Sequence, residues 1–423
     1  MKVLVIGGGG REHAIVSKLA ESPAIEALYC APGNGGIAAL AECVPIAATD
    51  IEKLADWAQA HAMDYVVVAP DDPLCLGLTD LLEQRGIPAF GPHKAAARIE
   101  GSKVFAKQLM EQNGIPTAKC AVFDDMLKAL SYIADCPVPL VVKADGLALG
   151  KGVIICQNRA EAAEAVRDMM EKGKFGASGE RVVIEEFLEG PEVSVLSFTD
   201  GETIVPMVSS MDHKRALDGD RGLNTGGMGV IAPNPYYTEE IAAECFEKIY
   251  LPTVHAMNAQ GCPFKGCLFF GLMLTKDGPK VIEYNCRFGD PEAQAVLPLL
   301  ETDLFQIMRH VTDGTLKDAD VRFSGNASCC VVIASGGYPE HYEKGKTIYG
   351  LPSATRQPDT WVFHAGTRKE GRQIVSNGGR VLGITAVADR LQGAVNRAYM
   401  VAEMITFEGA YKRTDIGKSA LNK

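Results

Sequence analysis

The sequence predicts a protein of several domains that combines an α/β region with α+β regions. Its 423 residues are more than one hydrophobic core normally organises. Apolar residues make up 47% of the chain and charged residues 22%, which is typical of a globular protein with a large core. The first hundred residues alternate short apolar strands with helices, and longer strands follow after residue 190. We therefore expect a parallel sheet at the N-terminus and α+β domains behind it.

Residues 1–100 are predicted to form a doubly wound parallel sheet with helices on both faces. The expected strands are residues 2–6, 27–30, 65–70 and 88–90, and the expected helices are residues 11–21, 51–62 and 73–85. Ligands of such sheets bind beyond the carboxyl ends of the strands. Three stretches rich in glycine or proline fall there, namely GGGGREH, APGNGG and APDDPL. This edge of the sheet is therefore a candidate binding site.

The turn Gly7–Gly10 lies between an apolar strand and a helix, where backbone amides suit an anion. The dinucleotide fingerprint GxGxxG fails here, because its third glycine would fall on Glu12 or His13. The second strand also lacks the acidic residue that would bind a ribose. With Arg11 beside it, the turn suits a single phosphate. A tight turn without a ligand is the alternative.

Residues 101–189 are predicted to form a small α+β lobe, which begins with a helix over 102–112. A glycine-rich loop, DGLALGKG, joins two of its strands at residues 145–152. The loop contains the Gly-Lys pair of a Walker A motif, but Gly152 replaces the required hydroxyl residue, so the motif fails. We expect a lid that folds over phosphates, with Lys143 neutralising their charge. An ordinary surface hairpin is the alternative.

Residues 190–320 are predicted to form a larger lobe with long strands and a helix near 238–258. The sequence TKDG at 275–278 predicts a hairpin turn between two of these strands. Residues 321–423 are predicted to form a small β-rich domain that ends in a helix near 390–407.

The segment VIEYNCRFGDPE carries the strongest chemical signal. Glu283 and Asn285 are two residues apart on a predicted strand and so share one face. Their oxygens suit Mg²⁺ held on phosphates. Arg287 continues along this face, where its guanidinium can meet a phosphoryl group. Burying these three side chains without a ligand would be unfavourable, so we expect a site here.

Two further stretches place polar groups close to turns. In IEEFLEGPE, residues 185–188 end a predicted strand, where backbone groups can pair with adenine and Glu192 can bind ribose hydroxyls. The alternative is that Glu185 and Glu186 are ordinary surface residues, as most pairs of adjacent glutamates are. MDHKR places Asp212 and Lys214 before the glycine-rich NTGGMG, which suits close backbone approach to a small polar substrate. His213 is not chosen as a base, because a surface or packing role explains it equally well.

The composition argues against several classes of protein. The net charge is −11 and there is no basic block, so no nucleic-acid partner is expected. With no long apolar run and no signal-peptide pattern, we expect no membrane partner and a cytoplasmic location. The twelve cysteines include no CxxC pair and are predicted to be reduced core residues. Cys262 and Cys267 lack a matching second pair, so no zinc site is expected.

Taken together, these motifs resemble those of the phosphoribosylamine–glycine ligase (glycinamide ribonucleotide synthetase) family, which belongs to the ATP-grasp superfamily. The resemblance rests on GGREH, APGN, KADGLALGKGV, EEFLEG, DHKR, NTGGMG and EYNCRFGDPE. It covers residues 1–295 in motifs, and it extends to the end of the chain in length and in TDIG at 414–417. NTGGMG and NCRFGDPE are the motifs most specific to this family.

The resemblance implies a fold, a reaction and partners. The domains would be a pre-ATP-grasp domain (1–100), a small ATP-grasp lobe with a lid (101–189), a large ATP-grasp lobe with a metal site (190–320) and a C-terminal domain (321–423). ATP, glycine and 5-phosphoribosylamine would give glycinamide ribonucleotide, ADP and phosphate through glycyl phosphate, in de novo purine synthesis. The metal would be Mg²⁺ or Mn²⁺. We expect a monomer that makes transient contact with the preceding enzyme of the pathway.

The resemblance also implies roles for individual residues. ATP would be contacted by Lys103, Lys143, Gly146, Gly150, Lys151, Gly152, Glu185, Leu188 and Glu192. The metal would be held by Glu283 and Asn285, while Arg287 and Lys143 would act in catalysis. Glycine and phosphoribosylamine would be bound by Gly9, Gly10, Arg11, Asp212, Lys214, Asn224, Gly226, Gly227 and Asp290.

Three positions depart from the pattern of the family. Gly8 stands where asparagine is common, Asp71 stands where glutamate is common, and Leu223 stands where proline is common. The first two fall where the amine substrate is expected to bind, so its contacts can differ from those of the family. The open alternatives are another ATP-grasp carboxylate–amine ligase, a non-catalytic nucleotide sensor and a nicotinamide dehydrogenase.

Overall fold

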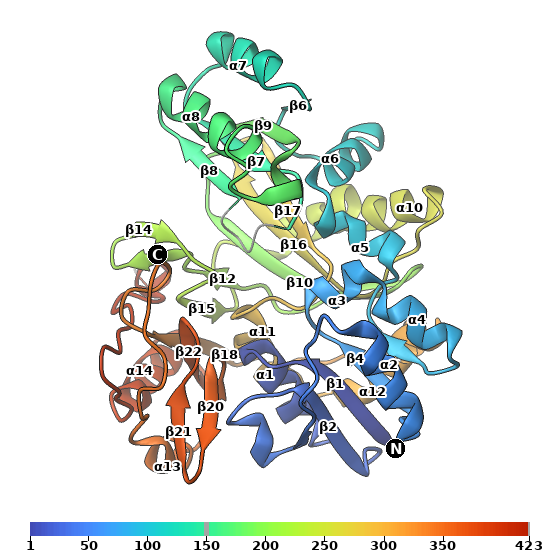
Figure 1. Cartoon of the computed structure of the whole chain (residues 1–423), viewed down its shortest axis with the longest axis vertical. Helices are drawn as coiled ribbons and strands as arrows, with labels where there is room; N and C mark the ends of the chain where they lie inside the picture. The colour runs from blue at the N-terminus through green and yellow to red at the C-terminus, as the bar shows by residue number, and fades with distance from the viewer. Residues whose placement is uncertain (148–151, 422–423) are drawn as a thin grey trace.

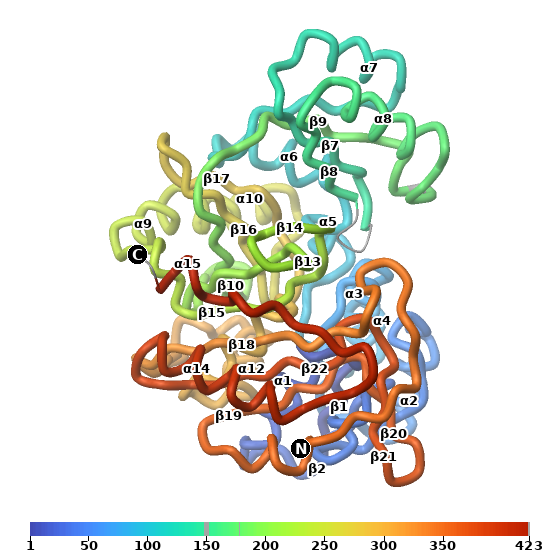
Figure 2. Tube along the Cα trace, turned by 90° about the vertical axis from the view of Figure 1, so that its left-hand side faces the viewer, coloured from blue at the N-terminus to red at the C-terminus, as the bar shows by residue number. Residues whose placement is uncertain are grey.

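The computed structural model describes residues 1–147 and 152–421. The N-terminal sheet lies beside the C-terminal elements at one end of the molecule, and the lobe that carries α7 and α8 stands at the other end (Figure 1). Figure 2 shows the same separation of this lobe in a view turned by 90°. Among the described residues, no helix is long and apolar enough to cross a lipid bilayer.

The N-terminal sheet has the strand order β3-β2-β1-β4-β5, and all of its pairings are parallel. Its strands are β1 (Lys2–Gly7), β2 (Ala27–Pro32), β3 (Glu42–Cys43), β4 (Tyr65–Val68) and β5 (Ala89–Phe90). Its helices are α1 (Gly10–Leu19), α2 (Ile51–Ala60), α3 (Asp71–Leu76) and α4 (Leu78–Gln84). Residues 3–6 are fully buried, as expected for a central strand covered on both faces. The predicted parallel sheet is confirmed.

The single helix predicted over residues 73–85 is wrong, because Gly77 interrupts it. Gly77 has a φ of +98°, a left-handed conformation that ends α3 and lets the chain restart as α4. The sequence prediction also missed α5 (Lys94–Gly101), which precedes α6 (Lys103–Gln112). Ser102 separates these two helices and caps α6, since its Oγ accepts a hydrogen bond from the Phe105 amide at 3.1 Å.

The small lobe is an antiparallel sheet of order β6-β9-β7-β8 with two helices packed on it. Its elements are β6 (Cys120–Phe123), α7 (Met126–Asp135), β7 (Leu140–Ala144), β8 (Val153–Cys156), α8 (Arg159–Met170) and β9 (Val182–Glu186). Apolar residues of the helices and the sheet form a core of their own, separate from the cores of the other regions. The predicted lid residues 148–151 lie outside the described part of the chain.

The large lobe is built on an antiparallel sheet of order β11-β10-β16-β17. Its strands are β10 (Glu192–Asp200), β11 (Ile204–Pro206), β16 (Lys265–Thr275) and β17 (Gly278–Asn285), and its helices include α9 (Glu239–Cys245), α10 (Leu251–Ala259), α11 (Glu292–Val296) and α12 (Leu304–Asp313). The predicted hairpin turn is confirmed, because β16 and β17 pair up to Thr275 and Gly278.

The C-terminal domain shares a sheet with the large lobe, which the sequence prediction did not foresee. The antiparallel order is β12-β15-β18-β22-β19. Its strands are β12 (Met211–Asp212), β15 (Gly229–Ala232), β18 (Ala327–Ala334), β19 (Thr360–His364) and β22 (Arg380–Ala388), with α14 (Leu391–Ala402) packed beside them. A boundary at residue 320 therefore divides strands of one sheet. The small hairpin of β20 (Thr367–Glu370) and β21 (Gln373–Ser376) was also not predicted.

Candidate active site

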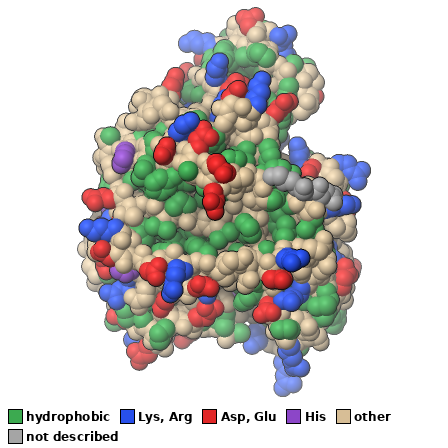
Figure 3. Space-filling view, turned by 180° about the vertical axis from the view of Figure 1, so that it is seen from behind, with side chains coloured by type: hydrophobic (Ala, Val, Ile, Leu, Met, Phe, Trp, Pro, Cys, Tyr) green, Lys and Arg blue, Asp and Glu red, His purple; other side chains and the backbone are tan. Residues whose placement is uncertain are grey.

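One cavity of about 460 Å³ lies where the N-terminal sheet, both lobes and the C-terminal domain meet. Seven cationic and seven acidic side chains line it: Arg11, Lys103, Lys107, Lys143, Lys214, Arg287, Arg380, Asp71, Glu100, Glu185, Asp212, Glu283, Asp290 and Glu292. On the outer face seen in Figure 3, basic and acidic side chains are instead scattered among neutral ones. Although the whole chain has a net charge of −11, the cationic side chains on the cavity wall equal the acidic ones in number, so the wall offers cations for the anionic groups of a substrate.

Two lysines enclose Glu185 on the wall formed by the small lobe. Lys143 Nζ on β7 lies 3.0 Å from Glu185 Oε2 and donates to the Ile282 carbonyl oxygen at 2.9 Å. Lys107 Nζ on α6 lies 3.1 Å from Glu185 Oε1. Burial lowers the pKa of Lys107, as it also does for Lys103 at the start of α6. An anionic ligand in the cavity would offset this cost of burying cations.

The face of β17 presents Glu283 and Asn285 to the cavity, and Arg287 follows directly after the strand. Lys214 Nζ lies 3.4 Å from Glu283 Oε1. This cation lowers the pKa of Glu283 below its ordinary value, and Lys143 and Lys103 add to the shift against the opposing effect of burial. Glu283 is therefore an ionised carboxylate at neutral pH.

Glu100 on α5 holds Arg287 in place. Arg287 Nη2 lies 3.1 Å from Glu100 Oε1, while Glu100 Oε2 accepts the Cys286 amide at 2.7 Å. Burial raises the pKa of Glu100, and the nearby guanidinium counteracts this. Arg287 Nε is buried and has no hydrogen-bond partner among the described residues. A buried donor without a partner on a cavity wall favours a bound acceptor there.

The donor set on β17 fits a small divalent cation shared with phosphates. Mg²⁺ in such sites usually takes one or two protein oxygen ligands and completes its shell with waters and substrate phosphates. An ionised Glu283 and the amide oxygen of Asn285 supply two. Within residues 1–147 and 152–421 there is no cluster of three or more His, Cys, Asp or Glu that could hold a metal alone. The residues thus fit a metal that depends on a phosphate ligand.

Asp212 on β12 and Glu292 on α11 form an acidic pair on another wall of the cavity. Burial raises the pKa of Asp212 well above its ordinary value, and the Glu292 carboxylate raises it further. Burial likewise raises the pKa of Glu292, whose Oε1 accepts a hydrogen bond from Ser194 at 3.3 Å. Asp212 Oδ1 is buried and unpartnered within the described chain. This pair suits a cationic or hydrogen-bond-donating group of a substrate.

The C-terminal domain contributes Arg380 and Tyr338, which the sequence prediction missed. Arg380 Nη1 donates to the carbonyl oxygens of Gly226 at 2.7 Å and Asp290 at 2.6 Å. Tyr338 Oη accepts the Gly226 amide at 3.2 Å. Arg380 opens an apolar strand after two glycines, which is no signal for a site, so the sequence could not single it out.

NTGGMG needs glycine at one position for a steric reason. Gly227 has a φ of +114°, and a Cβ there would lie 2.6 Å from Asp212 Oδ1. His213, next to Asp212, packs inside the protein. Its Nδ1 lies 3.1 Å from the Gly229 carbonyl oxygen and its Nε2 accepts the Gly417 amide at 3.1 Å. Of the two roles left open for His213, the structure shows packing.

Most of the predicted site residues meet at the cavity. Those that line it are Arg11, Lys103, Lys143, Gly152, Glu185, Asp212, Lys214, Asn224, Gly226, Glu283, Asn285, Arg287 and Asp290. Gly9, Gly10, Gly146, Leu188, Glu192 and Gly227 are not among the described lining residues, and Gly150 and Lys151 lie outside the described residues. Three of the six are bonded to lining residues. Glu192 Oε2 lies 3.0 Å from Lys214 Nζ, the Gly146 carbonyl oxygen accepts Lys103 Nζ at 3.0 Å, and the Gly227 amide donates to Thr225 Oγ1 at 3.0 Å.

The turn after β1 differs from the bare anion cradle that its sequence suggested. Glu12 folds back and its Oε2 accepts the Gly9 amide at 2.6 Å, so the helix supplies its own anion. Arg11 Nε lies 2.6 Å from Glu12 Oε1, and its Nη1 donates to the Phe288 carbonyl oxygen at 3.2 Å. A Cβ at Gly8 would lie 2.5 Å from the Gly33 carbonyl oxygen, so asparagine there would require a different turn.

Three models of one protein family match successive parts of the chain. The N domain of phosphoribosylglycinamide synthetase matches residues 1–100, its ATP-grasp (A) domain matches residues 101–293, and its C domain matches residues 328–419. The chain belongs to the phosphoribosylglycinamide synthetase family. Its membership fits the cavity, because all three domains of the synthetase contribute residues to the walls.

Relatives of this synthetase-family chain are similar over nearly their full length. A phosphoribosylamine–glycine ligase of Caldanaerobacter subterraneus subsp. tengcongensis is 49% identical over 416 residues, which is 98% of this chain and 99% of that protein. A phosphoribosylamine–glycine ligase of Vibrio vulnificus strain YJ016 is 47% identical over 424 residues, 100% of this chain and 99% of that protein.

Solved structures share the fold of this chain. The phosphoribosylamine–glycine ligase of Thermotoga maritima superposes with a TM-score of 0.85 at 33% identity, over 98% of this chain and 100% of that one. The biotin carboxylase domain of the Hydrogenobacter thermophilus 2-oxoglutarate carboxylase superposes with a TM-score of 0.74 at 18% identity, over 97% of this chain and 91% of that one. The second likeness concerns the fold alone.

Proposed function

We propose that this chain joins glycine to 5-phosphoribosylamine at the expense of ATP, giving glycinamide ribonucleotide, ADP and phosphate in de novo purine synthesis. One observation carries the proposal. In a chain similar end to end to proteins named phosphoribosylamine–glycine ligase, a single cavity brings lysines and arginines for phosphates together with two oxygen ligands for a metal.

ATP would lie along the wall formed by the small lobe and β17. Lys103 and Lys143 would neutralise its phosphates, with the loop of Gly146, Gly150, Lys151 and Gly152 folding over them. Glu185, Leu188 and Glu192 would hold the nucleoside. Glu283 and Asn285 would hold Mg²⁺ or Mn²⁺, which supplies charge neutralisation on the phosphate oxygens. The lysines that surround Glu185 support this placement, because such cations are needed where phosphoryl charge must be balanced.

The chemistry needs positioning more than a side-chain nucleophile. A carboxylate oxygen of glycine attacks the γ-phosphorus of ATP, and the bond to the ADP oxygen breaks, which gives glycyl phosphate. The amine nitrogen then attacks the acyl carbon, phosphate leaves, and the nitrogen loses a proton. Arg287, held by Glu100, would orient the phosphoryl group, and its partnerless Nε supports this role. Exclusion of water by the surrounding walls would protect the acyl phosphate from hydrolysis.

The two other substrates would occupy the side of the cavity nearest the C-terminal domain. Asp212, Lys214, Asn224, Gly226, Gly227 and Asp290 would bind glycine and the reacting end of the amine there. The unpartnered Asp212 Oδ1 beside Glu292 supports a seat for the glycine ammonium group. Gly9, Gly10 and Arg11 would take the sugar phosphate. Of these three residues, Arg11 is the best supported as a ligand of the sugar phosphate, because Arg11 lines the cavity, as Asp71 does.

Replacing Arg11 should therefore weaken the amine substrate selectively. In Arg11→Ala we expect the KM for phosphoribosylamine to rise by about tenfold, the effect of losing one charged hydrogen bond. The KM for ATP should stay within about twofold of the wild-type value, because ATP is placed on the far wall. Steady-state ADP release measures both constants. Arg11→Lys is the matched control, and its KM for phosphoribosylamine should lie between the values of the wild type and Arg11→Ala. If only the KM for ATP rises in Arg11→Ala, the turn belongs to the nucleotide site.

The proposed reaction is tested by substrate omission and by isotope transfer. ADP release should require ATP, glycine and phosphoribosylamine together. With glycine labelled by ¹⁸O in both carboxylate oxygens, the released phosphate should carry one labelled oxygen, because the C–O bond breaks after phosphorylation. Mass spectrometry of the phosphate provides the measurement.

A second route would activate the sugar instead of glycine. In that case the released phosphate would be unlabelled, and the carboxylate oxygen lost when the amide forms would leave as labelled water. That outcome would exclude glycyl phosphate, while ADP release without glycine would exclude the ligase activity itself.

A further inference from the structure

The hairpin of β13 (Arg215–Leu217) and β14 (Arg221–Asn224) carries cavity residues at both of its ends. Lys214 precedes β13 and Asn224 ends β14, and both line the cavity. Thr225 ties the two ends together, since its amide and its Oγ1 each donate to the Lys214 carbonyl oxygen at 2.8 Å. Any movement of the hairpin would therefore displace Lys214 and Asn224 together.

The hairpin has little support of its own. In the described chain, β13 and β14 pair only with each other and make a sheet of two strands. An isolated two-stranded hairpin is marginally stable in water. Residues 221–223 are exposed, and Leu223 keeps 51% of its surface accessible. Contacts from another segment must hold this hairpin in place.

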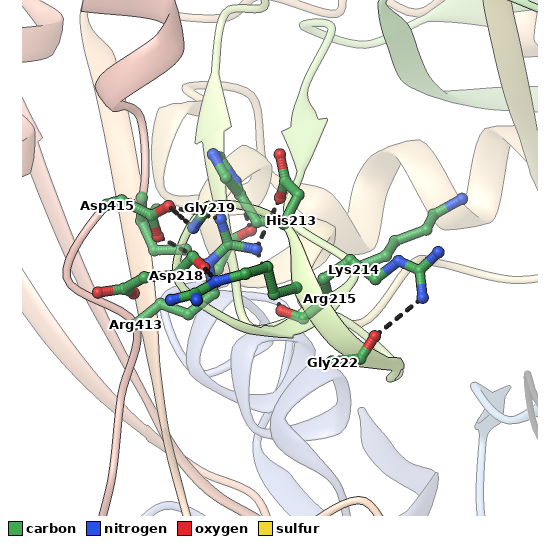
Figure 4. Close-up of polar contacts among 12 residues, drawn as sticks. His213, Lys214, Arg215, Asp218, Gly219, Gly222, Arg413 and Asp415 are labelled. Carbon is green, nitrogen blue, oxygen red and sulfur yellow. Dashed lines mark hydrogen bonds and ion pairs between the residues drawn. The ribbon is translucent and has the colours of Figure 1, made fainter.

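Arg413, near the C-terminus, provides such contacts from beneath the hairpin (Figure 4). The side chain is buried, with 2% of the residue exposed. Its Nη1 donates to the Arg215 carbonyl oxygen at 3.1 Å and to Asp220 Oδ1 at 2.9 Å. Its Nε and Nη2 donate to the two oxygens of Asp415 at 2.8 and 2.9 Å. A buried guanidinium with this many partners fixes geometry well.

The residues after Arg413 extend the same clamp. Asp415 Oδ2 accepts the Gly219 amide in the hairpin turn at 2.8 Å. Thr414 donates its amide to Asp218 Oδ1 at 2.8 Å and its Oγ1 to Asp218 Oδ2. The Gly417 amide donates to His213 Nε2 at 3.1 Å, just before Lys214. The segment 413–417 thus bonds to the entry, the first strand and the turn of the hairpin (Figure 4).

We infer that Arg413 is a positioning residue for the active site: it holds the hairpin so that Lys214 and Asn224 stay in the cavity. Arg413 is not among the described residues that line the cavity, and it acts through the Arg215 carbonyl oxygen, one residue from Lys214. Lys214 in turn reaches Glu192 at 3.0 Å and Glu283 at 3.4 Å. The role of the cavity in glycine ligation rests on the proposed function, but the clamp on the hairpin is a property of the fold.

The test compares Arg413→Met, Arg413→Lys and Thr414→Val with the wild type. In Arg413→Met, we expect the KM for glycine to rise by about tenfold, as for the loss of one well-placed contact. The KM for ATP should change much less. Trypsin should also cleave the folded variant after exposed Arg221 faster than it cleaves the wild type. In Arg413→Lys, the KM for glycine should lie between the values of the wild type and Arg413→Met. Thr414→Val, at an exposed position, should raise both the KM for glycine and the rate of cleavage after Arg221, each by a smaller factor.

Arg397→Met is the matched control. This arginine also pairs with an aspartate, Asp359 at 3.0 Å, and donates to a carbonyl oxygen, that of Val387 at 2.8 Å, but it lies on α14 away from the hairpin. It should change neither the glycine KM nor cleavage after Arg221. A general loss of thermal stability with unchanged KM and unchanged cleavage in Arg413→Met would overturn the inference.

The remaining outcomes are also decisive. If Arg413→Met does not fold, Thr414→Val decides, and normal cleavage and normal glycine KM in that variant would contradict the clamp. If the wild type releases no ADP in response to glycine, the proposed function fails, while the trypsin comparison still tests whether the segment 413–417 holds the hairpin.

Discussion

A Lys143→Met variant is expected to lose about two orders of magnitude in kcat while it remains folded, the usual effect of removing one charge-stabilising donor (about 3 kcal/mol). Lys143 Nζ stands on the cavity wall, bonded to Glu185 and to the Ile282 carbonyl oxygen beside Glu283. There it can neutralise charge that develops on a transferred phosphoryl group. Methionine keeps the apolar stem, so packing changes little. Single-turnover ADP formation and thermal melting measure the two effects.

Lys107→Met separates the proposed catalytic effect of the Lys143 charge from the effect of its ion pair with Glu185. Both lysines pair with Glu185, so either variant leaves that carboxylate with one cation. Lys107 also receives support from Thr117, whose Oγ1 accepts its Nζ at 2.7 Å. We expect the kcat of Lys107→Met to fall far less than that of Lys143→Met. Equal losses in the two variants would mean that the loss of one cation beside Glu185 causes the defect. Near-normal turnover in Lys143→Met would show that Lys143 takes no part in the reaction.

Glu283→Gln should raise the Mg²⁺ concentration needed for half-maximal activity by about tenfold or more, because the proposed metal site would lose the one described carboxylate on β17. Lys214 keeps the Glu283 carboxylate ionised in the wild type, and the amide cannot take over that charge. Mn²⁺ binding in the presence of ADP, followed by electron paramagnetic resonance, reports the same loss without relying on turnover. The variant should fold, since glutamine preserves the shape of the side chain.

Glu192→Gln is the matched control for the metal prediction. Like Glu283, Glu192 is a carboxylate partner of Lys214, at 3.0 Å. Its replacement removes one negative charge from the same lysine but leaves the β17 face intact. At an ADP concentration that saturates the variant, the Mn²⁺ titration of Glu192→Gln should match that of the wild type. If Glu283→Gln and Glu192→Gln shift the Mn²⁺ titration equally, the charge balance at Lys214 determines metal affinity, and the β17 face does not. If neither variant shifts the titration, Glu283 has a structural role only.

Local sequence determined most of the N-terminal elements and the polar face of one strand. Alternation of apolar strands with helices in residues 1–100 was enough to predict the parallel sheet. Strands that are covered on both faces are apolar along their whole length, and strands that face water on one side are not. The spacing of Glu283 and Asn285 was enough to place both on one side of β17, because side chains on a strand alternate with period two. Where a single backbone torsion decided the outcome, as at Gly77, the pattern of side chains could not show that a helix would break.

Tertiary structure alone decided which distant residues complete the cavity and what supports them. Glu100 meets Arg287 across 187 positions of the chain, Arg380 reaches Gly226 across 154, and Arg413 reaches Arg215 across 198. Each contact involves one residue, Glu100, Arg380 or Arg413, that lies outside the motifs identified in the sequence. Their partners are mostly backbone carbonyl oxygens, which every residue carries. Such contacts leave no signature in composition or spacing, and only the packing of the three domains brings them together.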